Sequence, residues 1–387
     1  MKKLAIVTTH PIQYNAPLFE MLSQRGHIKI KVFYTWGESV LKSKYDPGFK
    51  KNITWDIPLL NGYDYQFVKN TSKNPGSHHF KGIINPTLIK DIETWNADAI
   101  LVYGWKFKSH FKVIRYFKNK IPVYFRGDST LIDENINSFK FLIKKILLKY
   151  VYKNIDKCFY VGTENKKYFQ AFGISHNQLI FAPHAIDNKR FNIDNESNLR
   201  NQYKIDNNEF VILFAGKLEN KKNPTLLLDA FIELNIKNSI LMLVGNGELE
   251  KTLKIKCLNI DNDLKNRILF IDFQNQKTMP LIYKTADVFV LPSQGPGETW
   301  GLAINEAMAS GLPVIVSDKC GCTIDLIEDQ INGILFKSND LNSLKMSLKY
   351  ISENKERAKS MGKQANDSIQ KWSFENICEA IESVIYK

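Results

Sequence analysis

Short apolar runs alternate with longer amphipathic stretches along the first half of the chain. The apolar runs have the length and composition of buried strands and lie at residues 4–7, 28–34, 99–103, 122–125 and 157–162. Amphipathic stretches with helical spacing, such as 17–25 and 86–95, separate several of them. Strands that alternate with helices are typical of a parallel sheet with helices on both faces, so this half predicts a doubly wound α/β domain.

The alternation restarts after a polar segment at residues 188–209, which we interpret as a linker region. Strands are predicted at 210–216, 239–245, 267–272, 286–293 and 312–318. Helices are predicted between them at 224–234, 248–258, 278–285 and 302–310. The sequence therefore predicts two Rossmann-like parallel-sheet domains, an N-terminal one at 1–190 and a C-terminal one at 191–370, followed by an amphipathic segment at 371–387.

Polar and glycine-rich loops follow the strands of the second domain. They read GKLENKKN, GNGE, DFQNQ and SQGPGETWG in chain order. Ligands of parallel α/β sheets bind beyond the carboxyl ends of the strands, so these four loops are expected to lie together at one ligand-binding edge.

The last of these loops contains Glu298 and leads into the predicted helix that contains Glu306. Gly295 and Gly301 allow a tight turn and a close approach of the backbone to a ligand. The helix is expected to begin near Trp300 or Gly301 and to end at Gly311, and its first amide groups favour a phosphate. Glu298 is otherwise explained as a partner of the helix dipole and Glu306 as a solvated helix residue.

Charge is distributed unevenly between the two halves. Residues 1–190 contain 30 Lys and Arg against 14 Asp and Glu, whereas the remaining 197 residues contain 23 against 26. The basic half therefore suggests an anionic partner such as nucleic acid, anionic lipid or a phosphate-bearing substrate, and general solubility is the alternative.

Composition narrows the class of protein further. With 387 residues, 44% of them hydrophobic, the chain can bury a sizeable core, and no apolar run approaches the length of a membrane span. The N-terminal apolar run is too short for a secretory signal, and five scattered cysteines indicate a reduced, cytoplasmic protein. Cys320 and Cys322 lack a second pair of ligands, which argues against a zinc site.

Several motifs together resemble the retaining GT-B glycosyltransferases of the family-four type. The resemblance covers most of the chain and is densest at residues 210–336. Glu298 and Glu306 match the Glu-x7-Glu signature of that family, and GKLENKK matches its basic loop with Lys217 and Lys222. LVGNGE, FQNQKTMPLIYKTADVFVLPS and EAMASGLPVIVSD are also similar to family segments. A lone Glu-x7-Glu is weak evidence, but its agreement in register with the other segments is specific.

The resemblance implies two domains facing across a cleft, with the acceptor bound by residues 1–190 and the nucleotide sugar by residues 191–370. It also implies that the helix at 371–387 packs back on the N-terminal domain, and it implies a role for each matched residue. Glu298, Lys222 and Lys217 are the implied catalytic residues, because they contact the donor sugar and the departing diphosphate. The implied donor-binding residues are Glu306 at the ribose, the amides of Thr299, Trp300, Gly301 and Leu302 at the diphosphate, Phe273 and Gln274 at the nucleobase, and Gly295 beside the sugar. No cofactor and no essential metal is expected, since side chains supply the cations.

The N-terminal domain departs from the family pattern at two places. The loop after the first strand has no glycine, and we expect His10, Gln13 and Tyr14 in this loop to face the cleft near the diphosphate or the acceptor. A histidine common in relatives is replaced by RGDS, so Arg126 or Asp128 is expected to take over its contact with sugar or acceptor. A cap of the following helix is the alternative role of Asp128.

The segment at 138–154 indicates where in the cell the protein acts. Phe139, Ile143, Ile146, Leu147 and Tyr150 follow helical spacing and are interpreted as the stripe that packs on the core. The interpretation places the other apolar side chains, Phe141, Leu142, Leu148 and Tyr152, on a second face among five lysines, which suggests contact with an anionic membrane. A helix buried on two faces, with its lysines reaching into solvent, is the alternative.

The sequence therefore predicts a retaining hexosyltransferase that acts in surface polysaccharide biosynthesis, such as that of capsule, O-antigen or exopolysaccharide. Its expected partners are a nucleotide-diphosphate sugar, with a UDP-sugar favoured, and a saccharide or lipid-linked acceptor. A cytoplasmic protein, peripheral on the inner face of the cytoplasmic membrane, is expected. A GT-B sugar-nucleotide epimerase and a non-catalytic nucleotide-sugar or glycan binder are the alternatives. Nucleic-acid binding is not expected, because no such motif accompanies the basic residues.

Overall fold

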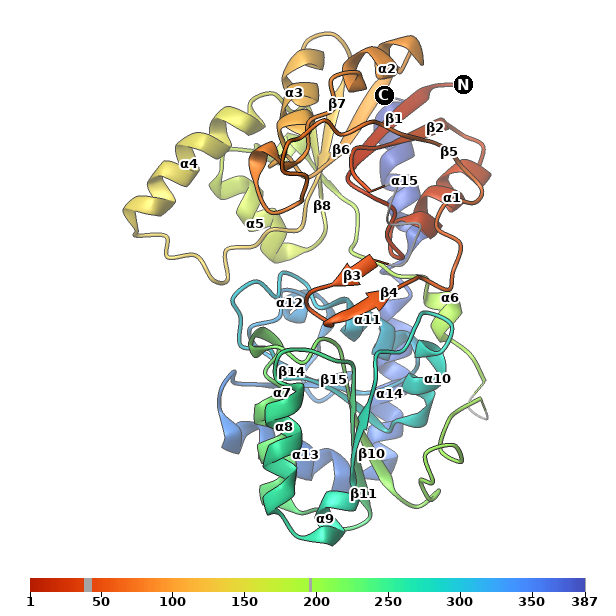
Figure 1. Ribbon diagram of the computed structural model, residues 1–387, viewed down its shortest axis with the longest axis vertical. Helices are drawn as coiled ribbons and strands as arrows, with labels where there is room; N and C mark the ends of the chain where they lie inside the picture. The colour runs from red at the N-terminus through yellow and green to blue at the C-terminus, as the bar shows by residue number, and fades with distance from the viewer. Residues whose placement is uncertain (38–43, 195–196, 387) are drawn as a thin grey trace. The chain divides into compact units, whose positions relative to one another are not determined.

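A computed structural model describes residues 1–37, 44–194 and 197–386 of the chain. The chain forms two compact units (Figure 1). The N-terminal unit consists of residues 1–44, 57–184 and 374–387, and the C-terminal unit consists of residues 45–56 and 185–373.

The N-terminal unit is built on a seven-stranded sheet in the order β5-β2-β1-β6-β7-β8-β9, and each pair of neighbouring strands is parallel. The strands are short, and most of their residues are buried, because apolar runs of this length fit the interior of a sheet that is covered on both faces. Their bounds are β1 (Lys3–Thr8), β2 (Lys29–Tyr34), β5 (Asp64–Phe67), β6 (Ala99–Tyr103), β7 (Val123–Arg126), β8 (Lys157–Tyr160) and β9 (Leu179–Phe181).

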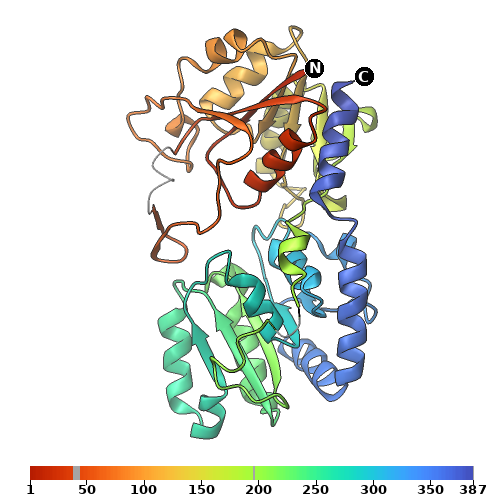
Figure 2. The same cartoon turned by 90° about the vertical axis from the view of Figure 1, so that its right-hand side faces the viewer.

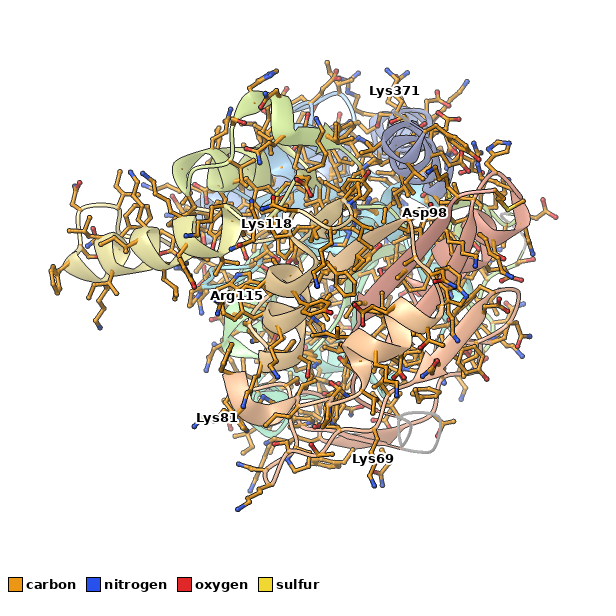
Figure 3. All side chains as sticks on the ribbon, turned by 90° about the horizontal axis from the view of Figure 1, so that it is seen from above. Lys69, Lys81, Asp98, Arg115, Lys118 and Lys371 are labelled. Carbon is orange, nitrogen blue, oxygen red and sulfur yellow. The ribbon has the colours of Figure 1, made fainter. Side chains whose placement is uncertain are left out.

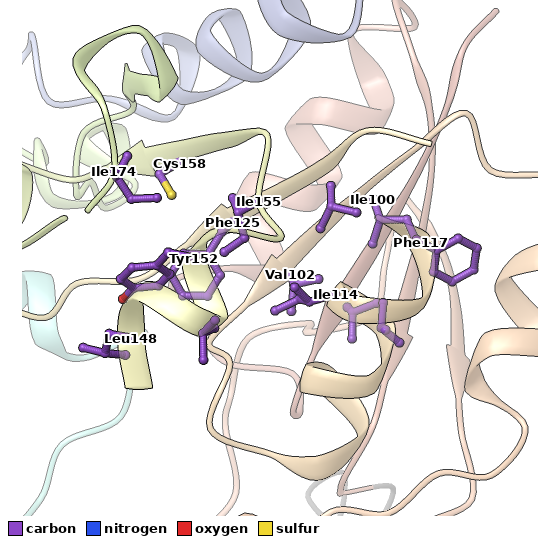
Figure 4. Close-up of a cluster of buried hydrophobic side chains, with 14 of the residues drawn as sticks. Ile100, Val102, Ile114, Phe117, Phe125, Leu148, Tyr152, Ile155, Cys158 and Ile174 are labelled. Carbon is purple, nitrogen blue, oxygen red and sulfur yellow. The ribbon is translucent and has the colours of Figure 1, made fainter. Parts of the chain in front are cut away.

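Helices connect these strands and enclose the core of the unit. Figure 4 shows part of this core, in which side chains of β6 and β7, such as Val102 and Phe125, face side chains of the helices, such as Ile114 and Leu148. The helices are α1 (Ala16–Gln24), α2 (Leu88–Thr94), α3 (Lys108–Phe117), α4 (Phe139–Tyr152), α5 (Thr163–Ala171) and α15 (Phe374–Ile385), with short 3-10 helices η2 (Phe80–Gly82) and η3 (His176–Gln178).

The last helix, α15, packs against α1 at the start of the chain. A bidentate ion pair fixes the two helices together: Arg25 Nε and Nη2 each lie 2.9 Å from one oxygen of the Glu382 carboxylate. His27 Nδ1 lies 3.0 Å from the same carboxylate. The amphipathic segment predicted at 371–387 thus forms part of the N-terminal unit from Phe374 onward.

The orientation predicted for the 138–154 helix is wrong. The expected core stripe is exposed in α4, with Phe139 at 75% and Ile146 at 65% of full side-chain exposure. Phe141, Leu148, Val151 and Tyr152 are buried instead. Both sets follow helical spacing, and periodicity alone does not tell which of two apolar faces meets the sheet.

The C-terminal unit contains a six-stranded sheet in the order β12-β11-β10-β13-β14-β15, again with every neighbouring pair parallel. Helices flank this sheet on both sides (Figure 2). The strands are β10 (Phe210–Ala215), β11 (Ser239–Val244), β12 (Ile268–Ile271), β13 (Val288–Leu291), β14 (Val314–Ser317) and β15 (Gly333–Phe336). The α-helices are α6 (Asn188–Phe191), α7 (Pro224–Leu234), α8 (Glu250–Lys256), α9 (Asn262–Asn266), α10 (Met279–Thr285), α11 (Leu302–Ala309), α12 (Thr323–Leu326), α13 (Leu341–Glu353) and α14 (Lys355–Ile369), and the 3-10 helices are η4 (Asn220–Lys222) and η5 (Cys257–Asn259).

A two-stranded sheet from the first part of the sequence also belongs to the C-terminal unit. It consists of β3 (Lys44–Asp46) and β4 (Lys51–Ile53), joined by a turn, and we call it the β3–β4 hairpin. Residues 45–56, which include most of it, group with the C-terminal unit, although the prediction gave the whole of 1–190 to the N-terminal domain. The boundary between the units also lies after His184 rather than after residue 190.

The two sheets confirm the α/β fold class predicted from the alternation of strands and helices. The prediction missed β5, β9 and β15, which are short and lie at or near the edges of the sheets. Within the described ranges, none of the helices combines the length and the apolar character that crossing a membrane requires.

Candidate functional site

The helix expected to begin beside Glu298 is α11, and Gly301 is its N-cap. Gly301 has φ 101°, a left-handed conformation that glycine adopts without strain. A Cβ at this position would also lie 3.2 Å from Leu291 Cδ2, so a side chain there would crowd the end of β13. The turn therefore delivers the first amides of α11 to the carboxyl edge of the sheet, where they favour an anion.

Glu298 is buried in an ion pair at this edge, with only 8% of its side chain exposed. Its Oε2 atom accepts hydrogen bonds from Lys222 Nζ at 2.9 Å and from Ser293 Oγ at 3.2 Å. Lys221 Nζ lies 4.0 Å away. Burial alone raises the pKa of Glu298, but the two lysines and these hydrogen bonds outweigh burial and hold the pKa below its usual value. Glu298 is therefore a carboxylate at neutral pH.

The loops after β10 and β13 are tied together, which sets the position of the lysines. The Gln294 amide N–H donates to the carbonyl of Lys221 at 2.9 Å, and its side chain donates to the carbonyl of Asn220 at 2.7 Å. These bonds bring Lys222 against Glu298 although the two residues are 76 positions apart in the chain. The structure thus brings together the two loops that the strand order predicted to meet.

Glu306 lies inside α11 and is buried, rather than solvated as a surface helix glutamate would be. Tyr283 on α10 donates its hydroxyl to Glu306 Oε2 at 2.8 Å. A buried carboxylate held by a phenol keeps a fixed orientation and further acceptor capacity, which suits it to bind a pair of ligand hydroxyl groups.

Trp300, one of the predicted donor-binding residues, packs its side chain inside the unit. Its indole N–H donates to Asn305 Oδ1 at 2.8 Å, and its ring lies 5.1 Å from that of Trp372. Gly321 passes directly beneath this turn: a Cβ on Gly321 would lie 1.8 Å from the carbonyl oxygen of Thr299. Side-chain contact between Trp300 and a ligand is therefore not expected, and only the backbone of the turn remains for that role.

The two cysteines around Gly321 support the same turn. The Gly321 and Cys322 amides donate to the carbonyls of Glu298 and Trp300 at 3.1 and 3.2 Å. Burial raises the pKa of the Cys320 thiol to about 12, so this thiol stays protonated. These contacts give the Cys-Gly-Cys segment a structural role beneath the site.

Phe273 and Gln274, the predicted nucleobase residues, follow β12 at the same edge of the sheet. The Phe273 amide donates to Asn246 Oδ1 at 2.9 Å, which links the loops after β11 and β12. The ring of Phe273 lies 4.8 Å from that of Phe49 and 6.2 Å from that of Trp55, both from the hairpin region. Lys217 lies nearer the hairpin than Lys222 does, and it pairs with Asp46.

In the N-terminal unit, His10, Gln13 and Tyr14 follow β1 and are partly exposed. Thr9 Oγ1 lies 3.0 Å from His10 Nδ1, and the imidazole meets the ring of Trp36 edge-on at 5.5 Å. His10 is thus oriented by its neighbours at the carboxyl end of the first strand. Its role toward a ligand stays a prediction.

Arg126 ends β7 and is buried. Its guanidinium donates to the carbonyls of Ala182 and Pro183 at 2.9 and 2.8 Å and so fixes the turn after β9. Burial and the charge of Arg126 lower the pKa of His184 in that turn to about 4, although Asp128 acts in the opposite direction. His184 is therefore neutral, and Arg126 holds the loop that carries it.

Asp128 is exposed and does not cap α4. Ser138 is the N-cap of that helix and accepts a hydrogen bond from the Phe141 amide at 3.1 Å. The capping alternative for Asp128 is wrong, because ten residues separate it from the true cap.

Three groups of contacts were missed by sequence reasoning. Tyr283 and Ser293 hold the two glutamates, but a lone tyrosine or serine gives no recognisable pattern. Lys222 was predicted to be a site residue, whereas the adjacent Lys221, which also lies near Glu298, was not. The β3–β4 hairpin was also missed. Its only clear sequence signal is Asp-Pro-Gly at 46–48, which predicts a turn but does not indicate the unit on which the turn packs.

Comparison with known proteins adds independent findings. Residues 195–368 match the family model described as glycosyl transferases group 1. The chain is 29% identical over 292 residues to a UDP-Gal:alpha-D-GlcNAc-diphosphoundecaprenol alpha-1,3-galactosyltransferase from Escherichia coli, over 70% of this chain and 73% of that protein. It spans 37% to 51% of the length of further curated relatives.

Solved structures share the fold over the whole chain. Sucrose-phosphate synthase from Thermosynechococcus elongatus superposes with a TM-score of 0.75 at 18% identity, covering 100% of this chain and 98% of that one. Anabaena Alr3699/HepE, solved in complex with UDP and glucose, superposes with a TM-score of 0.73 at 17% identity and covers 100% of both chains. The chain is thus similar to the glycosyl transferases group 1 over residues 195–368, and it shares the GT-B fold of these solved structures over its whole length.

Proposed function

We propose that this protein is a retaining glycosyltransferase that moves a hexose from a nucleotide-diphosphate sugar, with a UDP-sugar favoured, to a saccharide or lipid-linked saccharide acceptor. The observation that carries the proposal is the pair of buried carboxylates, Glu298 and Glu306, beside Lys222 and the start of α11. Burying two carboxylates is unfavourable unless their partners are arranged for it, and sites of this kind are typically functional.

The arrangement supports donor binding in three parts. Glu306 is oriented by Tyr283 to accept hydrogen bonds from two ribose hydroxyls. The first amides of α11, with Lys222 and Lys217, hold the diphosphate. Glu298, which pairs with Lys222, is the residue proposed to contact sugar hydroxyls.

In the proposed reaction the protein stabilises charge and does not supply a strong base. The bond between the anomeric carbon and the phosphate oxygen breaks, and negative charge grows on the departing diphosphate. Lys217, Lys222 and the helix amides stabilise this charge where it develops. The acceptor hydroxyl attacks the same face of the sugar and gives its proton to the phosphate oxygen that leaves. Since side chains supply the positive charge, we infer that an essential divalent metal is not required.

The names of two relatives support the proposed acceptor and pathway. The Escherichia coli relative is named for UDP-galactose and for an acceptor linked to diphosphoundecaprenol. A Salmonella typhimurium relative is a lipopolysaccharide 1,2-N-acetylglucosaminetransferase, 28% identical over 195 residues. We infer that this chain acts in the synthesis of a surface polysaccharide such as capsule, O-antigen or exopolysaccharide.

A screen of nucleotide sugars tests this function. The full chain is mixed with UDP-glucose, UDP-galactose, UDP-N-acetylglucosamine and GDP-mannose, with EDTA and then with Mg²⁺, and thermal stability and donor hydrolysis are measured. The expected result is stabilisation by one donor, slow release of its nucleoside diphosphate in EDTA, and loss of both in Glu306→Ala.

Other outcomes point to the alternative functions. Conversion of the donor to an epimer without release of nucleoside diphosphate would indicate a sugar-nucleotide epimerase. Binding without any turnover, even with lipid-linked saccharides added, would indicate a non-catalytic binder. Absence of stabilisation by every donor would reject the proposed function.

We further propose that α4 places the N-terminal unit on the inner face of the cytoplasmic membrane. Its exposed face carries six large apolar side chains, Phe139, Leu142, Ile143, Ile146, Leu147 and Tyr150, among lysines. The unit also presents Lys69, Lys81, Arg115 and Lys118 on its surface (Figure 3). Apolar side chains inserted between lipid headgroups, with lysines that attract anionic lipid, are the combination that binds such a surface.

Sedimentation with lipid vesicles tests the membrane proposal. Wild-type chain is expected to bind vesicles that contain phosphatidylglycerol more tightly than pure phosphatidylcholine vesicles. Ile143→Ser/Ile146→Ser should weaken this binding by about tenfold or more, because each isoleucine loses about 1.5–3 kcal/mol of burial at most. The matched control is Ile255→Ser/Leu258→Ser, which alters exposed apolar side chains of the C-terminal unit. Equal effects of the two double variants would contradict a specific role of α4.

A further inference from the structure

The β3–β4 hairpin lies on the loops that form the candidate donor site. It comes from the first 56 residues of the chain, yet its contacts are with residues that follow β10 and β12. The proposed function gives this hairpin no role. One of its ion pairs nevertheless involves Lys217, which the proposed function assigns to the diphosphate.

Asp46 at the end of β3 binds Lys217 directly. Lys217 Nζ lies 3.0 Å from Asp46 Oδ1 and 3.3 Å from Oδ2. The same carboxylate accepts hydrogen bonds from the amides of Gly48 and Phe49 at 2.7 and 3.0 Å, which fixes its orientation. Burial raises the pKa of Asp46, but these bonds and the charge of Lys217 together leave it below its usual value, so the group is ionised at neutral pH.

The turn of the hairpin fits closely around the lysine. A Cβ on Gly48 would lie only 2.4 Å from Lys217 Nζ, so the side chain of Lys217 crosses directly over this glycine. The ammonium group also lies 5.1 Å from the centre of the Phe49 ring. Asp46 and Phe49 thus hold Lys217 from two sides.

Further contacts anchor the hairpin independently of Lys217. Lys51 Nζ lies 2.7 Å from Asp272 Oδ2, and the ring of Phe49 packs against Phe273. Asn275 donates its side-chain amide to the carbonyl of Thr54 at 2.6 Å. The Asp46 carboxylate is therefore held at the donor site by the fold and does not depend on Lys217 for its place.

We propose that Asp46 competes with the diphosphate of the donor for Lys217, and so acts as a charge-selective element of the donor site. This inference rests on the proposed function, because that function assigns Lys217 to the diphosphate. The ammonium group of a lysine carries a single positive charge. The Asp46 carboxylate and a diphosphate beside the same ammonium group would therefore repel each other. A ligand must therefore carry enough negative charge to replace Asp46, whereas a nucleoside without phosphate does not meet Lys217.

Asp46→Asn isolates the charge from the shape of the hairpin. Asparagine keeps Oδ1, which accepts from Gly48 and Phe49, and replaces the second carboxylate oxygen with an uncharged NH2 group of similar size. Binding to the full chain is measured by calorimetry with UDP and inorganic pyrophosphate as charged probes and with uridine as the uncharged probe. We expect Asp46→Asn to bind UDP and pyrophosphate about threefold to tenfold more tightly than wild type and to leave uridine binding unchanged.

Two controls connect this effect to Lys217. In a Lys217→Gln background, Asp46→Asn should no longer tighten UDP binding, because the competed group is absent. Lys51→Gln removes another ion pair of the hairpin without altering charge at Lys217, and we expect it to change UDP binding by less than twofold.

The outcomes separate this inference from the function on which it rests. Unchanged UDP binding in Asp46→Asn, while Glu306→Ala weakens it, would overturn the competition and leave the donor site in place. Weaker UDP binding in Asp46→Asn would also overturn it, because Asp46 would then position Lys217 for the ligand. If UDP, GDP, ADP and TDP fail to bind both wild type and Asp46→Asn, the proposed function itself is rejected, and the inference with it.

Discussion

The carboxyl edges of the two sheets hold buried charge in different ways. In the C-terminal unit, Glu298 and Glu306 are buried, and their partners are the side chains of Lys222 and Tyr283. At the corresponding edge of the N-terminal unit Arg126 is buried, and its partners are the backbone carbonyls of residues 182 and 183.

Under the proposed function, this difference separates a charged site for the donor from a scaffold that fixes a loop of the N-terminal unit. Pairs of side chains can exchange partners when a charged ligand arrives, so the C-terminal edge is prepared for an anion. Arg126 fixes a loop of its own unit. His10 is partly exposed and Asp128 is exposed, and a contact of either residue with a ligand stays a prediction. Four substitutions test this contrast.

The largest effect is expected for Lys222→Met. It removes the positive charge that we propose stabilises the departing diphosphate, and losing one such group typically costs about 100-fold to 1,000-fold in turnover. Donor hydrolysis with the sugar nucleotide found by the screen is the measurement. Lys221→Met is the matched control, because Lys221 lies at 4.0 Å from Glu298 rather than at 2.9 Å. Similar losses in the two variants would indicate that general positive charge, and not the Lys222 pair, matters.

Arg126→Met is expected to affect folding and not donor binding. It leaves two carbonyls of the turn after β9 without their donor, which costs about 2 kcal/mol of unfolding free energy. Urea unfolding and UDP affinity are both measured, and Arg115→Met, an exposed position on α3, is the control. If Arg126→Met kept its stability but lost transfer to the acceptor, Arg126 would belong to the acceptor site and the contrast between the two edges would fail.

A smaller effect is expected at Glu306. Glu306→Gln keeps the size of the side chain but loses the charge that we propose accepts from ribose hydroxyls, so UDP should bind about tenfold more weakly, equivalent to about 1.4 kcal/mol. Tyr283→Phe removes only the hydroxyl that orients Glu306, and a loss of twofold to fivefold is expected. Titration calorimetry with UDP measures both. A larger loss in Tyr283→Phe than in Glu306→Gln would show that the tyrosine, and not the glutamate, meets the nucleotide.

The sequence predicted the central strands and the meeting of the loops that follow them, because strand order places these loops at one edge. The same rule placed Lys222 at the edge where α11 starts, but its ion pair with Glu298 was not predicted. The partners of the glutamates did not follow, since Tyr283 and Ser293 are recognisable only once the distances are known. The sequence assigned the Trp300 amide to the diphosphate, which stays a prediction, and it gave no sign that the indole N–H binds Asn305.

Two features were beyond sequence reasoning for physical reasons. Helix α4 has two apolar stripes, and the choice between them depends on what the sheet offers, so Phe139 and Ile146 were placed in the core although they are exposed. The hairpin turn at 46–48 was readable, but its docking on β10 and β12 depends on contacts between residues more than 150 positions apart, such as Asp46 with Lys217.

The smallest effect concerns the stability of the N-terminal unit and its dependence on pH. Burial raises the pKa of Glu382, but the hydrogen bonds and charges of Arg25 and His27 outweigh burial, so the folded pKa lies below its usual value. A carboxylate with a lowered folded pKa contributes stability above its unfolded pKa of about 4.3, and this contribution is lost as the pH falls through the folded value. Arg25→Met should therefore lower the free energy of unfolding by about 1 kcal/mol at pH 7 and by clearly less at pH 3. Urea unfolding at the two pH values measures this.

Lys2→Met is the control, because its pair with Asp98 is exposed and its loss should cost little unfolding free energy at either pH. An equal loss for Arg25→Met at both pH values would mean that Arg25 stabilises α1 against α15 by packing, and that charge is not what joins the last helix to the N-terminal unit.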